Sequence, residues 1–235
     1  MKSTYNNRLF NNPFRRKIHL ARFHWLKKVT QIYYPNYLSI FEFGCHDSKS
    51  LLFLPYPPIE YIGLDADWEG GLNIAKKKFK KIDEYKFLKT KNIKDFPILK
   101  NKFDLVICLE TLEHLPPDDL EEYLLKLSSL MKAYFIITVP NEIGFIFLIK
   151  YVTKVLFNLN PDKYNILELY HQFIGKVELV KRNNHKGFSW LKLVKILEKH
   201  FEIVRIEGIP FSFLPKFLNF GIGIILTNKN KKLYP

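Results

Sequence analysis

The sequence predicts an α/β fold whose sheet is mainly parallel and ends in an antiparallel pair of strands. From residue 38 to residue 139, short apolar runs alternate with amphipathic stretches of helical spacing, which is the order that builds a parallel sheet with crossover helices. The strand candidates are continuous apolar runs, as expected for strands that are buried on both faces. The last two candidates are joined by residues 207–220, which show no helical pattern, and strands joined without a helical crossover pair antiparallel.

Seven segments are expected to be strands. In chain order they are Ser39–Phe43, Tyr61–Leu64, Phe87–Lys89, Leu105–Leu109, Tyr134–Val139, Phe201–Ile206 and Gly221–Thr227. Helices are expected at Ser48–Leu54, Gly71–Ile82, Asp118–Met131 and Ser189–His200. The third of these has the clearest beginning, because Asp118 and Asp119 put negative charge in a first turn that follows two prolines.

The chain of 235 residues is long enough for one sizeable domain and short for two. Residues 1–37 are expected to be an N-terminal helical extension, with helical segments around Arg16–Tyr33, and residues 38–235 the main domain. No apolar run reaches the length of a membrane span. Two cysteines give neither a disulfide framework nor a metal-type Cys/His cluster, which predicts a cytoplasmic location and no metal ligands.

The charge balance is strongly basic, with 37 Lys and Arg against 23 Asp and Glu, a formal net charge of +14. Such a chain favours anionic partners: nucleic acid, an anionic membrane surface or a phosphorylated substrate. The lysines are spread along the whole chain, so a solvated lysine-rich surface with no partner explains the charge equally well.

Two motifs at strand ends indicate a nucleotide-type site. The first strand runs into "GCHDS", Gly44–Ser48, and a turn at that place holds a ligand in many α/β proteins. About twenty residues later the second strand ends on Asp65, where an acid accepts both hydroxyls of a ribose. Only one glycine is present, so the G-x-G-x-x-G turn that a nicotinamide-dependent dehydrogenase needs for pyrophosphate is missing.

With its later motifs the sequence resembles the class I S-adenosylmethionine-dependent methyltransferases, most closely their small-molecule and lipid-modifying branch. The matching segments are "FEFGCHDS", "GLDAD", "FDLVICLETLEHLP", "ITVPN" and "NHKGFSWLKLVKILEKHFEIVRIEG". The resemblance covers residues 39–141 well and residues 184–227 more loosely. It implies a Rossmann-like, doubly wound sheet of seven strands, mainly parallel with an antiparallel last strand, and S-adenosyl-L-methionine as cofactor.

The resemblance also assigns a cofactor-binding set at the ends of the strands. Its members are Glu42, Gly44, Cys45, His46, Asp65, Ala66, Asn92, Ile93, Leu109 and Glu110. Gly44 would let the backbone approach the methionine part of the cofactor, Asp65 would bind the ribose, and Asn92 would meet the adenine. His46 and Ser48 stand where the family usually has glycine. The imidazole of His46 would either crowd the carboxylate of the cofactor or donate to it.

A hydroxyl acceptor needs a general base, and His114, just past the fourth strand, is the candidate; the competing interpretation is a histidine that caps a turn. His171 and His185 are weaker candidates. The end of the fourth strand lacks the Asn/Asp-Pro-Pro-aromatic motif of base-amine methylation, and Cys108 does not follow a proline. A small-molecule, sugar- or lipid-linked acceptor is therefore expected. The alternatives are a non-catalytic binding or scaffold protein and an RNA-modifying methyltransferase.

An apolar segment is inserted after the fifth strand, over about residues 142–185. It carries Lys150 and Lys154 one turn apart, which fits either a lid over the substrate or a helix in a membrane interface. The second alternative implies peripheral contact with the inner face of a membrane through residues 143–157. The acceptor pocket is expected to be lined by aromatic residues of this region and beyond: Tyr164, Tyr170, Phe173, Phe188, Trp190 and Phe211.

Overall fold

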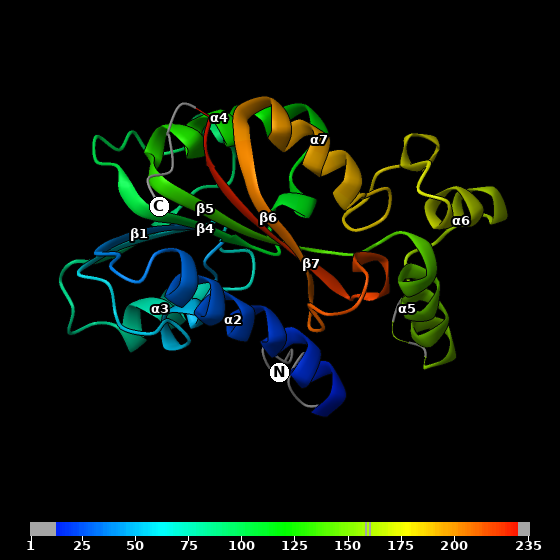
Figure 1. Cartoon of the computed structure of the whole chain (residues 1–235), viewed down its shortest axis with the longest axis horizontal. Coiled ribbons are helices and arrows are strands. Elements are labelled where there is room, and N and C mark those ends of the chain that lie inside the picture. The colour runs from blue at the N-terminus through cyan, green and yellow to red at the C-terminus, as the bar shows by residue number, and fades with distance from the viewer. Residues whose placement is uncertain (1–12, 158, 160, 230–235) are drawn as a thin grey trace.

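The computed structural model describes residues 13–157, 159 and 161–229 of the chain (Figure 1). One sheet of seven strands has the order β3-β2-β1-β4-β5-β7-β6. The strands are β1 (Ser39–Phe43), β2 (Glu60–Asp65), β3 (Tyr85–Lys89), β4 (Phe103–Leu109), β5 (Met131–Pro140), β6 (Phe201–Ile209) and β7 (Gly221–Asn228). β1 to β5 are parallel, while β7 runs antiparallel to both β5 and β6. The predicted fold class and the seven predicted strands are confirmed.

The strand order reverses at β1, and this reversal places the candidate site. The chain passes from β1 outward to β2 and β3, then returns to place β4 on the other side of β1. Phe43 at the end of β1 is in register with Leu64 of β2 and Cys108 of β4. The carboxyl ends of these three strands therefore lie together, and a crevice outside such ends is where doubly wound sheets bind ligands.

Helices cover both faces of the sheet (Figure 1). On one face α4 (Pro117–Leu130) and α7 (Trp190–His200) pack against strand residues such as Val106, while on the other α2 (Pro13–Tyr33) and α3 (Gly71–Lys78) pack near Leu105 and Ile107. Because side chains alternate along a strand, β4 contributes to both cores, and this explains its apolar run from Leu105 to Leu109.

The predicted helices differ from the observed ones mainly in length. The segment expected as a helix at Ser48–Leu54 is only the 3-10 turn η1 (Lys49–Leu52), which begins after Ser48 because that residue has a left-handed backbone, with φ of 51°. The helix expected at Gly71–Ile82 ends at Lys78. Further 3-10 turns are η2 (Ile93–Asp95), η3 (Leu112–His114), η4 (Val177–Leu179) and η5 (Lys216–Leu218).

The N-terminal helix α2 is one continuous helix, and it is part of the core. Trp25 Nε1 donates a hydrogen bond of 2.7 Å to Glu207 Oε2 on β6. A Cβ on Gly223 of β7 would lie 2.3 Å from the ring of Trp25, so glycine permits this close approach of helix and strand. Residues 1–12 of the expected extension lie outside the described part of the chain.

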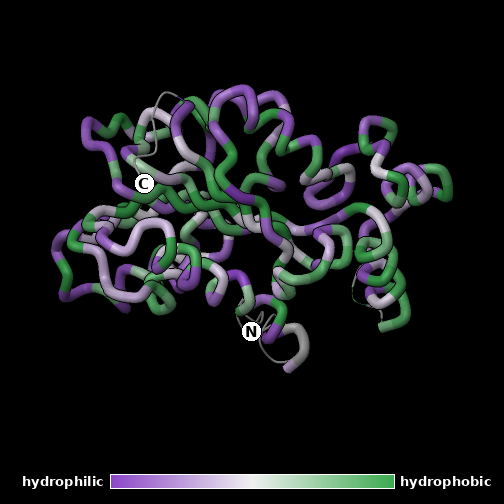
Figure 2. The backbone as a smooth tube through the Cα atoms, viewed as in Figure 1, coloured by the Kyte–Doolittle hydropathy of each residue, from purple (hydrophilic) through white to green (hydrophobic). Residues whose placement is uncertain are grey.

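The inserted segment forms α5 (Gly144–Leu156) and α6 (Ile166–Phe173), which project from one end of the sheet (Figure 1). α6 begins with a capping box, in which Asn165 Oδ1 accepts from the Glu168 amide and the Glu168 carboxylate accepts from the Asn165 amide. Most residues of α5 are hydrophobic (Figure 2), and Lys150 and Lys154 interrupt them. Within the described residues, no helix has both the length and the apolar character needed to cross a membrane.

Candidate functional site

A cavity of about 670 Å³ lies at the carboxyl ends of β1, β2 and β4. Its volume falls in the range of pockets that hold small molecules. Eight of the ten residues predicted to bind a cofactor line it: Gly44, Cys45, His46, Asp65, Ala66, Asn92, Leu109 and Glu110. Glu42 and Ile93 lie outside this lining.

Gly44 makes the turn at the end of β1 possible. Its φ is +75°, and a Cβ at this position would lie 1.9 Å from Thr111 Oγ1. Its amide donates to the carbonyl of Leu64 over 2.7 Å, which ties the turn to the end of β2. Only glycine fits both the backbone conformation and the space, and the result is a loop whose backbone borders the cavity.

His46 and Ser48 adopt the left-handed backbone that glycine usually supplies, with φ of 46° and 51°. The His46 ring packs against Gly71 at the start of α3, where an added Cβ would lie 2.7 Å from the imidazole. His46 Nδ1 lies 3.6 Å from Asp47 Oδ1, and this contact raises the pKa of His46. The imidazole lines one wall of the cavity.

Asp65 occupies the end of β2, as predicted. Its Oδ2 accepts from the His46 amide over 2.9 Å and its Oδ1 from the Asp67 amide over 2.6 Å. An ionised carboxylate has about four acceptor sites. Asp65 lines the cavity, so two acceptor positions remain for donors of a ligand.

Glu42 lies behind the loop. It is buried, and its Oε2 accepts from Ser50 Oγ and from the hydroxyl of Tyr61, each over 2.5 Å. Burial raises the pKa of this carboxyl to about 7. These contacts support the expected role of Glu42 in holding the loop, while contact with a ligand stays a prediction.

The far end of the cavity is bordered by segments after β2 and β3. Asn92 is exposed, and its Nδ2 donates to Asp95 Oδ2 over 3.3 Å, which leaves its amide oxygen able to accept. Ile93, the next residue, packs into the core below the cavity. Trp68 is largely exposed at the edge.

The end of β4 brings two histidines together. His114 and His185 both line the cavity, and their ring centroids lie 4.8 Å apart at nearly a right angle. Burial and the nearby Arg182 guanidinium lower the pKa of His114, and burial lowers the pKa of His185 to about 3. Both imidazoles are therefore neutral at pH 7 and able to accept a proton or to bind a cation. His171, on α6, is not part of the lining.

Several lining residues were not anticipated. Arg22 of α2 and the pair Lys154 and Asp162 of the inserted segment border the cavity, with Lys154 Nζ 3.6 Å from Asp162 Oδ2. Helical periodicity predicts which face of α2 is buried. It does not predict that Arg22 reaches the cavity beside loops that are distant in the sequence. The insertion thus supplies part of the wall, as a lid would.

The aromatic lining was predicted wrongly. The aromatic residues that border the cavity are Phe23, Phe43, Trp68 and Tyr123. Of the expected set, Phe188 and Trp190 are buried in the main core, and Tyr164 packs on Phe147 and Tyr151. Tyr170, Phe173 and Phe211 are exposed. None of the six expected aromatic residues lines the cavity.

Comparison with known proteins places this site in context. Residues 40–133 match a family model described as a methyltransferase domain. No curated protein sequence matches the chain. Three solved structures illustrate the range of methyltransferases that share this fold. Each is less than 25% identical to the chain, so the similarity shows the fold alone.

One is magnesium protoporphyrin IX methyltransferase from Synechocystis PCC 6803 with bound S-adenosylhomocysteine, with 17% identity, 94% of this chain and 92% of that chain covered, and a TM-score of 0.60. The plantazolicin methyltransferase BpumL is 15% identical, with a TM-score of 0.55, and the match covers 94% of this chain and 93% of that chain. The small RNA methyltransferase HEN1 has 20% identity and a TM-score of 0.62, over 93% of this chain and 26% of that one.

Proposed function

Because residues 40–133 form a methyltransferase domain within a class I methyltransferase fold, we propose that this chain is an S-adenosylmethionine-dependent methyltransferase. Its acceptor is a hydroxyl group on a small-molecule, sugar-linked or lipid-linked substrate. The observation that carries the proposal is the meeting of the Gly44 turn and the Asp65 carboxylate in one cavity of about 670 Å³.

The residues of this cavity fit the cofactor. The positive φ of Gly44 turns the loop so that its backbone borders the cavity, and in the proposed complex this backbone meets the methionine part. Asp65 has acceptor positions for a ribose diol, and the free amide oxygen of Asn92 accepts from the adenine amino group. The cofactor has no phosphate, so the loop needs neither of the additional glycines of a dinucleotide site.

When bound, S-adenosylmethionine supplies a methyl group activated by its sulfonium. Transfer to a hydroxyl would release the hydroxyl proton, and we propose that the imidazole of His114, which lines the cavity, would accept it. The remaining task of the protein is to align the two groups and exclude water.

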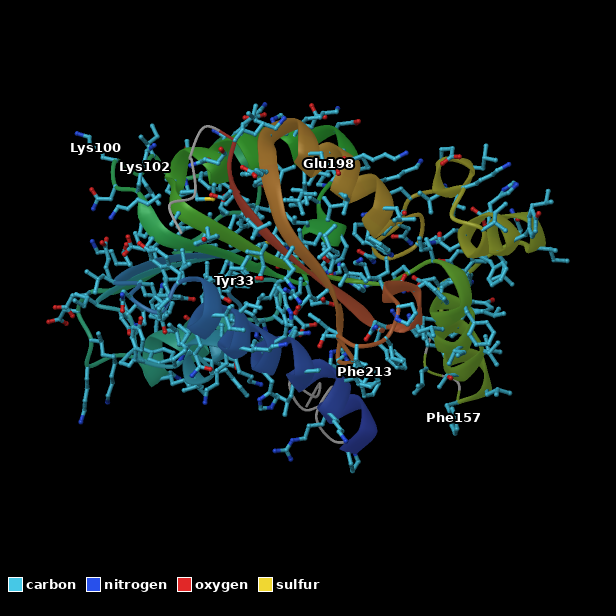
Figure 3. All side chains as sticks on the ribbon, in the orientation of Figure 1. Tyr33, Lys100, Lys102, Phe157, Glu198 and Phe213 are labelled. Atoms are coloured by element: carbon cyan, nitrogen blue, oxygen red, sulfur yellow. The ribbon has the colours of Figure 1, made fainter. Side chains whose placement is uncertain are left out.

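The surface of the inserted segment supports an amphiphilic acceptor. Phe145, Ile149, Val152 and Leu156 of α5 are all exposed, and their spacing puts them on one side of the helix. A continuous exposed apolar stripe marks a contact site. Phe157, at the end of α5, and Phe213, on the loop before η5, lie at the same lower side of the molecule (Figure 3). We therefore include peripheral contact with the inner face of a membrane in the proposal.

The two lysines of α5 do not take the role expected of an interfacial helix. Lys150 Nζ lies 2.5 Å from Glu142 Oε1 and also donates to the Asn141 carbonyl, and Lys154 pairs with Asp162. Both ammonium groups are held by partners within the protein. Membrane contact through this segment accordingly depends on apolar area rather than on these charges.

An RNA acceptor is the second candidate, and the formal net charge of +14 is the observation that favours it. A filter-binding assay with single-stranded RNA at rising salt separates the two proposals. Salt-dependent affinity supports the RNA acceptor, and its absence removes it.

Isothermal titration of the purified chain with S-adenosylmethionine and S-adenosylhomocysteine tests the cofactor directly, with NAD⁺ as the control ligand. The expected result is one site for each of the first two and none for NAD⁺. No binding of either sulfur compound at millimolar concentration defeats the proposal. Mass spectrometry of small molecules that copurify with the chain then identifies the acceptor class.

A further inference from the structure

A cluster of metal-ligating side chains lies on the wall of the cavity. Glu113, His114 and His185 each offer one ligand atom, and these atoms lie within 4.8 Å of one another. Glu113 and His114 belong to η3, directly after β4, while His185 comes from the loop before α7. The fold brings two segments about seventy residues apart in the chain to one point.

The second observation is that the buried carboxyl of Glu113 lacks a partner. Glu113 is 0% exposed, and neither of its carboxyl oxygens has a hydrogen-bond partner within the described part of the protein. Arg182 donates to the backbone carbonyl of Glu113 and not to its side chain. His114 Nε2 lies 3.8 Å from Glu113 Oε1, too far for a hydrogen bond. His185 Nδ1 is likewise without a hydrogen bond.

Such an arrangement is costly unless something binds there. An unpaired buried carboxyl is unfavourable in either protonation state, because the neutral form also has a hydrogen to donate. A cation between the carboxylate and the two imidazoles removes this cost.

We propose that Glu113, His114 and His185 bind one divalent transition-metal ion. Imidazole nitrogens and a carboxylate oxygen suit Mn²⁺, Fe²⁺, Co²⁺ or Zn²⁺, whereas Ca²⁺ prefers oxygen ligands alone. With metal–ligand distances of about 2.0–2.2 Å, neighbouring ligand atoms on one such ion lie about 3–3.5 Å apart. The ligand atoms, now within 4.8 Å of one another, would therefore need to move closer by up to about 2 Å, which rotation of the two partly exposed imidazoles would have to supply.

The position of the cluster gives the ion a role that rests on the proposed function. His114 and His185 line the cavity while Glu113 lies behind them, so the open coordination positions face the acceptor. An ion there binds the acceptor hydroxyl and lowers its pKa. The imidazole of His114 then holds the ion rather than the proton, which passes to solvent. Acceptors with a second oxygen next to the reacting hydroxyl are favoured, because they chelate.

Metal titration of the full chain, after removal of metal with a chelator, tests the site without an activity assay. We expect one Mn²⁺ or Zn²⁺ per chain by calorimetry, little Ca²⁺ binding, and a visible Co²⁺ absorption spectrum with nitrogen ligands. Glu113→Gln and His185→Ala weaken binding about tenfold or more. His200→Ala, which removes an imidazole near the opposite ends of the strands, leaves the affinity unchanged.

Two results overturn the proposal: no metal binding by the parent chain, or equal affinity in the parent and in both variants, with folding of each checked by thermal melting. S-adenosylhomocysteine is titrated into the same samples. If S-adenosylhomocysteine binds and metal does not, only the metal site is contradicted. If metal binds and S-adenosylhomocysteine does not, only the proposed cofactor is contradicted.

Discussion

The backbone amide of His46 donates a hydrogen bond of 2.9 Å to Oδ2 of Asp65. This bond joins the loop after β1 to the end of β2, so one carboxylate both shapes the loop and faces the cavity. The proposed ribose ligand and the loop that borders the methionine part therefore depend on the same side chain.

Asp65→Ala is expected to weaken the binding of S-adenosylhomocysteine about tenfold to a hundredfold, because hydrogen bonds to a charged group contribute about 1.5–3 kcal/mol. Asp65→Asn keeps one oxygen and should lose less. Calorimetry measures both affinities. Glu198→Gln, on the outer side of α7 (Figure 3), is the matched control; an Asp65→Ala affinity equal to that of this control contradicts the assignment.

Gly44→Ala is expected to destabilise the fold by about 2–4 kcal/mol, from a strained positive φ together with overpacking. The new Cβ meets Thr111 Oγ1 at 1.9 Å. Urea unfolding measures the effect. Thr111→Gly in the same chain removes the clash. It should recover the part of the unfolding free energy that is lost to overpacking, while the loss from backbone strain remains. Strictly additive effects of the two substitutions would show that these residues are not in contact.

His46→Gly separates an enzyme from a non-catalytic relative. If the parent chain binds S-adenosylmethionine, this substitution relieves a left-handed backbone that costs a non-glycine residue about 1–2 kcal/mol, and it changes the affinity by less than the Asp65 variants do. Calorimetry of parent and variant decides the matter. Binding that appears only in His46→Gly would identify a loop that has lost its cofactor, and the scaffold interpretation would then hold.

The central strands were predictable from the sequence because they are apolar runs that pack on both faces, as Leu105–Leu109 shows. The start of η1 after residue 48 was not predictable, because it depends on the left-handed backbone of Ser48. Side-chain type does not encode that conformation, since serine rarely adopts it.

The part of the cavity that we propose for the cofactor was predictable from strand ends, because parallel pairing brings Gly44 and Asp65 together. The part that we propose for the acceptor was not predictable. Glu113 and His185 belong to distant segments, and neither spacing matches a local metal motif, so only the folded chain brings them together. Likewise, Phe188 and Trp190 were predicted to line the acceptor pocket, but the packing of α7 buries them in the core.

Glu42 gives the fold a defined pH dependence. Burial raises its pKa to about 7 from an ordinary value of 4.5, so the folded chain keeps a proton that the unfolded chain has lost. The stability that Glu42 contributes is complete below pH 4.5, falls as the pH rises to 7, and is constant above that. The total change is about 3 kcal/mol.

Glu42→Gln removes this titration while keeping an oxygen that accepts from Ser50 and Tyr61. The difference between the unfolding free energies of variant and parent, measured in urea at pH 4.5 and pH 8, is expected to change by about 3 kcal/mol in favour of the variant at high pH. Glu198→Gln should show no such change. A difference that is flat with pH shows that Glu42 titrates normally.

The apolar stripe of α5 predicts binding to lipid vesicles. Leu156 is 75% exposed and Phe145 56% exposed, and burying a side chain of this size contributes about 1.5–3 kcal/mol when complete. Replacing both by serine is therefore expected to lower vesicle affinity about tenfold or more in a sedimentation assay with phosphatidylcholine vesicles. Ile98→Ser removes an apolar side chain that is 97% exposed but lies outside the inserted segment, and it should leave binding unchanged.

Since Lys150 and Lys154 are paired within the protein, anionic lipid should strengthen binding only modestly through them. A parent chain that stays in the supernatant, or an Ile98→Ser variant that loses binding as strongly as the double variant, contradicts a membrane role for α5 and favours a lid that closes over the cavity.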